Sequence, residues 1–509
     1  MTRSFLSLVL AGAAVLGMSS LVRAQDGDVL RLATSFPITS LDPISEGYWM
    51  QEFGVGELLM QFREDGEFHP WLLSDLEVID DTRWRLTVRE GVTFQNGRAL
   101  DAEAVHAAIT HQLENSSAAA ASFETGSFAV TGDHEITFTS AAPFPALPGL
   151  LSDESIFLIY DVEALEAAGG DDAAIAASGM YTGPYALESL GSEELVATRN
   201  DAYWQGTPAM DAVSVRFIPD VNARLLAVQN GEVDIALFMP IAVQPVVAAT
   251  PGLHFNYDTP SVNTYSGFVN TARPPLDDAR VRVALIKAID YESIANDAFF
   301  GIFQPTTSFY SPLFDFAIDT IETDRDAAAR LLDDAGWALG NDGLRYKDGQ
   351  PLELTVLYNP GVSDLVALSG ALQAQLREVG FLVTPQGVPD TYAAYGQVEW
   401  AMGLHNQANS GNGVPEQFLL RWLATDAPRN YGGYSNAEID RLAEELAVTV
   451  DPERRHELLA RVQEIMVDED PGFLVFTQSR LAVVTNDAYA HYQPGFYFYN
   501  LDWQTQPNR

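Results

Sequence analysis

Polar side chains suited to holding a small molecule are concentrated in residues 405–413, directly after an apolar strand predicted over residues 400–404. A loop at the end of such a strand can present hydrogen-bond donors and acceptors to a polar solute. An ordinary polar loop, with His405 as a structural histidine, is the alternative interpretation. The side chains that we assign to ligand binding in this stretch are those of His405, Asn406, Gln407 and Asn409.

Motifs for catalysis are missing from the sequence. Neither a Gly-x-Ser-x-Gly nucleophile turn nor a Gly-x-x-x-x-Gly-Lys phosphate loop occurs. His134-Glu135 and His456-Glu457 both lack the second histidine, four positions on, that a helical zinc site requires. The 70 acidic residues are too many to single out a glycosidase pair. We therefore predict a protein that is not an enzyme, with a secreted hydrolase as an alternative.

Charge and cysteine content exclude further classes of function. The formal net charge is −42, from 28 basic and 70 acidic residues. A nucleic acid is excluded as a partner because phosphate binding needs a basic surface. The chain has no cysteine, which removes disulfides, thiolate metal sites and cysteine nucleophiles. We predict no cofactor.

The first 24 residues have the features of a secretory signal peptide. Arg3 gives a positive start, residues 5–21 are apolar apart from glycine and serine, and Val22-Arg23-Ala24 fits the small-residue cleavage rule. A membrane anchor is the alternative, but glycine and serine weaken the apolar run. We predict cleavage near Ala24 and a periplasmic protein.

The elements that would position the binding residues alternate between strands and helices, which predicts an α/β fold. Alternating apolar and polar residues indicate the strands, and Asp101 is expected to cap a helix. Strands are predicted at 29–34, 83–89, 194–199, 212–218, 233–237, 352–357 and 473–476, the last of them terminal, and helices at 48–62, 102–113, 222–229 and 365–379.

Eight segments, in order along the chain, resemble the extracytoplasmic solute-binding proteins of family 5, which serve peptide and nickel ABC importers. The match covers essentially the whole mature chain. The segments are Leu41-Asp42-Pro43, residues 70–75, residues 84–97 with Asp101-Ala102-Glu103, and residues 182–185, 199–204, 230–234, 268–271 and 277–290.

The resemblance implies two α/β lobes joined by two crossing strands, with an extra α+β subdomain inserted in lobe one. Ligand would be enclosed when the lobes close. Carried onto this chain, lobe one takes residues 25–62, 179–262 and 476–509, the inserted subdomain takes 63–178, and lobe two takes 263–475.

The resemblance also implies which further side chains face the ligand. In lobe one these are Tyr48, Trp49 and Met50, and in lobe two they are Tyr265, Tyr392 and Trp400, beside the polar stretch at 405–413. Peptide binders of the family usually carry an aspartate in a Gly-Asp-Pro-like segment, where this chain has Gly413-Val414-Pro415-Glu416. Glu416 is therefore a candidate replacement, and without it short peptides are less favoured.

Nickel carriers of the family use histidine and arginine in the cleft to hold a metal–chelator complex. His405 is a poor match to their metal-binding histidine, so it is only a weak metal candidate and metal binding stays open.

The function predicted is that of the solute-binding component of an ABC importer, which captures a small polar ligand by hinge closure. The ligand classes left open are peptide-like compounds, nickel and metal–chelate complexes. The expected partners are this ligand and the transmembrane subunits of an ABC permease, and the protein is expected to be a monomer. A peptide-holding, chaperone-like protein is a further alternative.

Overall fold

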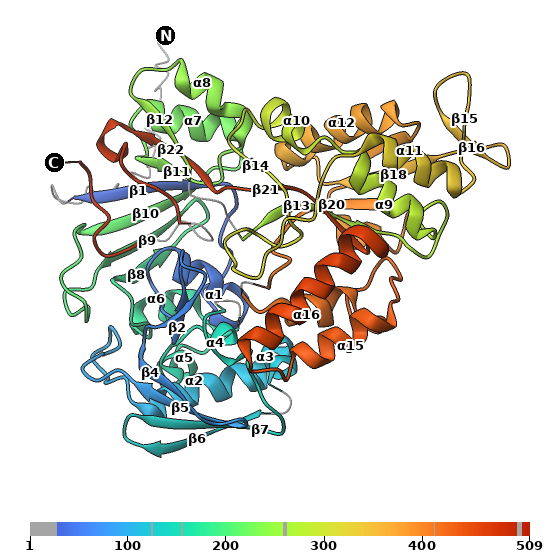
Figure 1. The fold of residues 1–509 in the computed structure, drawn as a ribbon. Helices are drawn as coiled ribbons and strands as arrows, with labels where there is room; N and C mark the ends of the chain where they lie inside the picture. The colour runs from blue at the N-terminus through green and yellow to red at the C-terminus, as the bar shows by residue number, and fades with distance from the viewer. Residues whose placement is uncertain are drawn as a thin grey trace, which may run out of the picture.

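The computed structural model describes residues 28–123, 126–153, 156–257, 262–411, 413–495 and 501–508. The predicted signal peptide, residues 1–24, lies outside these ranges. The described chain forms three bodies, each built on its own sheet (Figure 1). We call them lobe one, the inserted subdomain and lobe two. Within the described ranges, no helix has both the length and the apolar character that a membrane crossing needs.

Lobe one is built on a seven-stranded sheet. In sheet order its strands are β12 (Leu253–Tyr257), β22 (Ala482–Asn486), β11 (Ile235–Ala236), β1 (Val29–Thr34), β10 (Ala212–Phe217), β9 (Glu194–Arg199) and β8 (Tyr185–Leu190). Strand β1 pairs in parallel with both β10 and β11, and helix α7 (Val221–Gln229) forms the crossover between these two. Helix α8 (Gln244–Ala248) also belongs to this lobe. Helix α6 (Asp172–Ser178), the last element within the predicted bounds of the inserted subdomain, packs against the core of lobe one.

Helix α1 (Pro43–Glu52) of lobe one begins and ends earlier than the helix predicted over 48–62, so that prediction was wrong. The Asp42 carboxylate caps its start by accepting two backbone N–H hydrogen bonds, at 2.9 and 3.1 Å. Pro43 then takes the first helical position, where a missing N–H costs nothing. Gly54, with a φ of 70°, ends the helix because it adopts the left-handed conformation readily.

The inserted subdomain contains a four-stranded antiparallel sheet. Its strands are, in sheet order, β4 (Leu73–Asp80), β5 (Arg83–Val88), β7 (Glu135–Ser140) and β6 (Gly126–Gly132). The helices α2 (Ala102–Asn115), α3 (Ser117–Ser122), α4 (Leu147–Leu150) and α5 (Val162–Ala168) accompany it. A small hairpin of β2 (Met60–Phe62) and β3 (Phe68–Pro70) leads into it. Asp101 caps α2 as predicted, since its carboxylate accepts the Ala104 N–H at 2.9 Å.

Lobe two is built on a six-stranded sheet. In sheet order its strands are β14 (Gln304–Pro305), β21 (Phe473–Gln478), β13 (Thr264–Val269), β20 (Met402–Gln407), β18 (Glu353–Tyr358) and β19 (Leu382–Gly387). Its helices include α9 (Ala279–Ala288), α10 (Tyr291–Ser293), α11 (Arg325–Asp334), α12 (Ser363–Glu378), α13 (Thr391–Ala394) and α14 (Pro415–Phe418). A separate small sheet holds β15 (Ala338–Leu339), β16 (Arg345–Lys347) and β17 (Gln350–Pro351).

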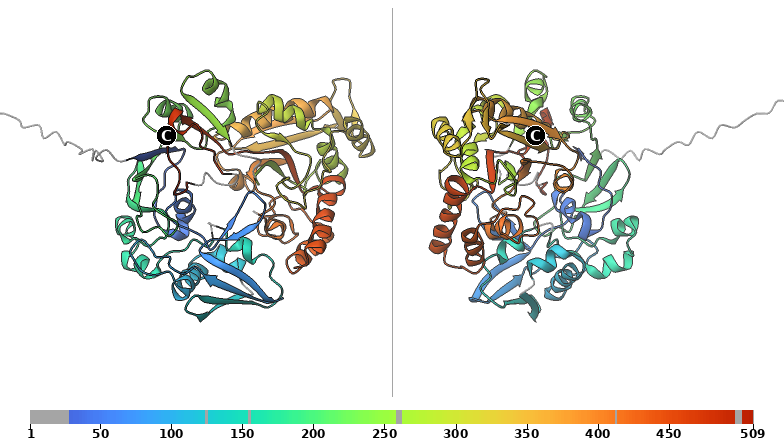
Figure 2. Two further views of the ribbon diagram at one scale, coloured as in Figure 1. Left: turned by 60° about the vertical axis from the view of Figure 1, so that its left-hand side comes forward. Right: turned by 90° about the vertical axis from the view of Figure 1, so that its right-hand side faces the viewer.

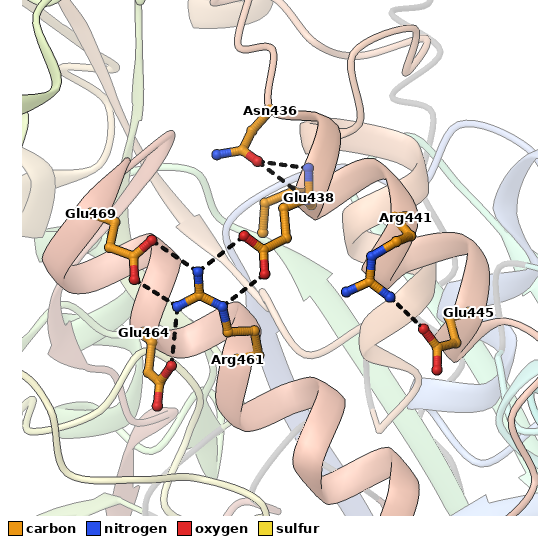
Figure 3. A network of polar contacts seen from close by, with 8 residues as sticks. Asn436, Glu438, Arg441, Glu445, Arg461, Glu464 and Glu469 are labelled. Carbon is orange, nitrogen blue, oxygen red and sulfur yellow. Dashed lines mark hydrogen bonds and ion pairs between the residues drawn. The ribbon is translucent and has the colours of Figure 1, made fainter.

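Two further helices of lobe two, α15 (Ala437–Leu446) and α16 (Pro452–Glu464), are joined by a network of polar contacts (Figure 3). Arg461 of α16 donates hydrogen bonds to Glu438 of α15 at 2.8 and 3.0 Å and to Glu469 at 2.6 and 3.0 Å. The Asn436 side chain caps α15. A network of this kind stabilises more than an isolated surface pair, so these helices are expected to move with the lobe as one body.

The chain passes between the two lobes twice. The first connection leads from β12 to β13, and the second, residues 479–481, joins β21 to β22. The predicted strand at 473–476 is therefore not the last one: β21 stays paired within lobe two through Gln478, and β22 returns the chain to lobe one. Figure 2 shows the two lobes beside each other, with the inserted subdomain against both. Each body has its own apolar core, as rigid parts joined by a hinge require.

Candidate ligand-binding site

A cavity of about 220 Å³ lies where the inserted subdomain meets lobe two. Because its walls come from bodies that the hinge can separate, closure would enclose whatever it holds. The inserted subdomain contributes Gly149, Leu150 and Asp153, the first connection contributes Asn263, and lobe two contributes Asn406, Gln407, Ala408, Gly411, Val414, Gln417, Phe418, Arg421 and Trp422.

Helix α14 and the π-helical turn after it (Leu419–Leu423) position the largest wall of this cavity. Gln417 and Arg421 are four residues apart, and so are Phe418 and Trp422, so all four side chains lie on one helical face. The wall thereby combines two apolar rings with an amide and a cation. Such a mixture can surround the body of a solute and fix one polar end of it.

Arg421 is the strongest electrostatic feature of the cavity. Its guanidinium is half-buried and forms no hydrogen bond or ion pair with any other described residue. Burial lowers its pKa, the neighbouring charge of Arg429 lowers it further, and Asp153 acts in the opposite direction. A cation that has lost part of its hydration without gaining a fixed partner would bind a carboxylate or another planar anion well.

Asn406 and Gln407 are the two predicted binding residues that line the cavity. Both lie at the end of β20, where the side chains reach the surface of the lobe-two sheet. The Tyr392 hydroxyl donates a hydrogen bond of 3.4 Å to Oε1 of Gln407. Tyr392 does not line the cavity itself but helps to fix the Gln407 side chain that does. These amides supply both donors and acceptors, which suits a polar ligand of small size.

His405 lies one residue before this pair but faces the interior of lobe two. The predicted loop at 405–413 begins too early, since β20 runs on to Gln407, and His405 belongs to the part of this strand, Met402 to His405, that is buried throughout. Its side chain is 8% exposed, stacks on Tyr392 at 4.4 Å and shares a 2.5 Å hydrogen bond between Nε2 and the Tyr395 hydroxyl. Burial lowers the pKa of His405 to about 4, so the ring is neutral at neutral pH.

Four other predicted residues of lobe two are held by internal contacts, and none of them lines the cavity. The Trp400 indole donates to the Tyr395 carbonyl at 3.1 Å, and the Asn409 amide donates to the Phe309 carbonyl at 2.5 Å. Glu416 is 1% exposed and forms an ion pair with Arg455 at 2.8 Å. The Tyr265 hydroxyl donates to the Asp364 carboxylate at 3.1 Å.

The predicted residues of lobe one do not line this cavity, and two of them lie near one edge of the lobe-one sheet. Tyr48 and Trp49 are half-exposed and form an aromatic cluster with Phe36 and Phe238, with the Phe36 and Trp49 ring centroids 4.3 Å apart. Phe36 and Phe238 follow the carboxyl ends of the parallel strands β1 and β11, where open α/β sheets tend to bind ligands. Met50 is fully buried in the core of lobe one.

A larger cavity of about 670 Å³ has no wall from lobe two. Its lining residues come from the end of α1, the β2–β3 hairpin, the segment around Tyr203 and the C-terminal segment with Trp503. Closure of the lobes would not enclose a ligand there, so we assign the candidate site to the smaller cavity. Across the described ranges, no cluster of three or more His, Asp or Glu side chains could hold a bare metal ion.

Several cavity residues escaped the sequence analysis, namely Asp153, Asn263, Gln417, Arg421 and Trp422. A signal for part of this set exists in the sequence. Arg421 is the one charged residue in the apolar run at 418–423, and cavity residues recur at 414, 417, 418, 421 and 422 with helical spacing. Asp153 has no such signal, because only the fold brings it to lobe two, and Asn263 is a single polar residue before β13 with no spacing pattern.

Two sheet-based lobes, a hinge of two connections and a polar cavity at their junction define a hinged binding protein. The family model of bacterial extracellular solute-binding proteins, family 5 (middle region), matches residues 67–430. This match covers more than half of the chain, which therefore belongs to that family.

Individual relatives bind different solutes. The nickel-binding periplasmic protein of Escherichia coli (strain K12) is 27% identical over 343 residues, which is 64% of this chain and 64% of that protein. The glutathione-binding protein GsiB of Salmonella paratyphi A is 26% identical over 496 residues, covering 90% of this chain and 91% of that protein.

The solved structure of NikA from Brucella suis in complex with Fe(III)-EDTA matches with a TM-score of 0.81 at 23% identity, covering 94% of this chain and 100% of that one. NikA from Staphylococcus aureus in complex with Ni(L-His)₂ matches with a TM-score of 0.77 at 20% identity, covering 95% and 100%. The predicted fold class, two α/β lobes with an inserted subdomain, is confirmed.

Proposed function

We propose that this protein captures a small solute bearing a carboxylate or similar anionic group and delivers it to an ABC permease without transforming it. The observation that carries this proposal is the half-buried guanidinium of Arg421 in the junction cavity, which pairs with no residue in the described part of the chain. Hinge closure would bring the inserted subdomain over the solute while Arg421 holds its anionic end. The amides of Asn406, Gln407 and Gln417 would provide the remaining polar contacts.

The surroundings of Val414 and Glu416 support an anionic rather than an ammonium anchor. Val414, which stands where peptide binders of the family usually carry an aspartate, is buried and apolar. Glu416 is buried and paired with Arg455. Neither side chain offers a free carboxylate to a peptide amino group, so the amino end of a peptide would add little affinity.

A metal would be carried inside a complex under this proposal. The described residues contain no three-residue metal cluster, and His405 is buried with Nε2 engaged by Tyr395. Nickel bound to an organic acid or amino acid would instead be held through the carboxylates of the chelator. We further propose that the mature protein is a periplasmic monomer with the lobe boundaries given above.

Isothermal titration calorimetry with matched solutes tests the proposal. Glutathione, dialanine and nickel with L-histidine each carry carboxylates, and dialanine amide is the matched probe without one. We expect at least one carboxylate-bearing solute to bind and expect dialanine amide not to bind. Equal binding of dialanine and its amide, or binding by none of the carboxylate-bearing solutes, would contradict the proposal. Turnover of a bound solute would favour the hydrolase, and binding only to unfolded chains would favour the chaperone.

A further inference from the structure

One side chain of lobe two lies inside the core of a different body. Val414, in the loop before α14, is 4% exposed and packs in the apolar cluster of the inserted subdomain. Leu147 and Leu150 of α4 belong to the same cluster. Because these groups are parts of separate bodies, the contact exists only while lobe two and the inserted subdomain are closed on each other.

Glycine forms the seat for this side chain. A methyl group at Gly149 of α4 would overlap Cγ2 of Val414 and lie 3.1 Å from Cζ of Phe68. On the opposite side, a Cβ atom at Gly413 would lie 2.8 Å from the same Phe68 ring atom. The two bodies therefore approach closely at this point because both carry glycine there.

A second aromatic contact spans the same boundary. Phe62 of the β2–β3 hairpin stacks on Phe314 of lobe two, with ring centroids 5.8 Å apart and an interplanar angle of 18°. The boundary is thus apolar on one side of the cavity, where Val414, Gly149 and Leu150 are also lining residues. Burial of such surface favours closure with no help from a ligand.

We propose that Val414 and its glycine seat form a closing latch, which joins the two walls of the candidate site even when no solute is present. This inference deepens the proposed hinge closure and rests on it. The free protein would then spend a measurable fraction of time closed, with Arg421 already aligned in the cavity. The apparent affinity for a solute that binds the closed form rises in proportion to that fraction.

Single-molecule energy transfer in the solute-free protein tests the latch. The chain has no cysteine, so Glu103→Cys on α2 and Glu453→Cys on α16, both exposed, would carry the only dyes. We expect a closed population in the otherwise unchanged protein. Gly149→Ala should lower the closed-to-open ratio on the order of tenfold or more, since overpacking is costly.

Gly370→Ala is the matched control, because it makes the same change in helix α12 with no other atom within 4 Å of the added methyl group. It should leave the closed fraction unchanged. Should Gly149→Ala fail to fold, Val414→Ala alone still removes the latch and should lower the ratio by roughly tenfold. A fully open free protein, or a closed fraction insensitive to both changes, would overturn the latch.

Failure of the latch and failure of the proposed function give different results. If the free protein is fully open but glutathione or nickel with L-histidine closes it, the latch is wrong and the proposed function stands. If the latch variants behave as expected but no carboxylate-bearing solute binds, the proposed function is wrong and the latch stands.

Discussion

Replacing Arg421 with glutamine removes the cation while keeping a polar side chain of similar reach. A unit charge pair 4 Å apart interacts with about 4 kcal/mol at an effective dielectric constant of 20. Arg421 is only half-buried, so solvent screening reduces this figure, and we expect a loss of about 2–3 kcal/mol in binding free energy. This corresponds to roughly 30- to 150-fold weaker binding of a carboxylate-bearing solute.

Calorimetry with glutathione or dialanine, whichever binds the unchanged protein, measures this loss for Arg421→Gln. Arg429→Gln is the control, because Arg429 is exposed, stacks on Trp422 at 4.9 Å and does not line the cavity, yet the change in net charge is the same. The solute affinity of Arg421→Lys should lie between those of the unchanged protein and Arg421→Gln, since lysine keeps the charge but loses the planar pair of donors. If Arg421→Gln binds within twofold of the unchanged protein, Arg421 is not the anchor.

Three further substitutions separate structural from binding roles. Glu416→Gln breaks the buried pair with Arg455 and should lower the free energy of unfolding in urea by roughly 3 kcal/mol, with solute affinity unchanged; a tenfold affinity loss would place Glu416 in the site. His405 has a folded pKa of about 4, below its ordinary 6.5, so the stability it contributes is present above pH 6.5 and lost as the pH falls toward 4. Urea titrations at pH 7 and 4.5 should show a smaller difference in the free energy of unfolding for His405→Gln than for the unchanged protein. An equal difference in the two proteins would contradict this assignment. Burial raises the pKa of Asp364 to about 6, so its contribution to stability is present below pH 3.8 and lost as the pH rises through 6. Asp364→Asn should abolish that loss of stability. If the free energy of unfolding of this variant varies with pH as it does in the unchanged protein, the Asp364 carboxyl group is not its cause.

Several strands were predictable from the sequence, but the ends of elements were less so. Alternation at 29–34 and 194–199 identified β1 and β9 with their observed bounds. The helix predicted at 48–62 begins too late because apolar spacing does not mark the start of α1, whereas an aspartate followed by proline, Asp42-Pro43, does. The short strand β22 was missed because four of its five residues are buried, so its sequence has no alternation of apolar and polar residues.

The sequence predicted the part of the candidate site at the end of β20 but not the helical wall that holds Arg421. Asn406 and Gln407 line the cavity, whereas His405 lies in the buried part of β20 and stacks on Tyr392. Arg421 is a single charge within an apolar helical segment, which is a weaker sequence signal for a binding site than the run of polar residues at 405–413. Sequence patterns show which residues share an element. Asp153 and Arg421 line one cavity because the inserted subdomain packs against lobe two, and no local pattern predicts that packing.

Small-angle X-ray scattering of the mature protein, with and without a saturating solute identified by calorimetry, tests most directly whether the lobes close over a ligand. We predict a smaller radius of gyration for the solute-bound protein and no such change for Arg421→Gln at the same solute concentration. An identical scattering profile with and without solute, at concentrations where calorimetry shows full occupancy, would contradict hinge closure around this cavity.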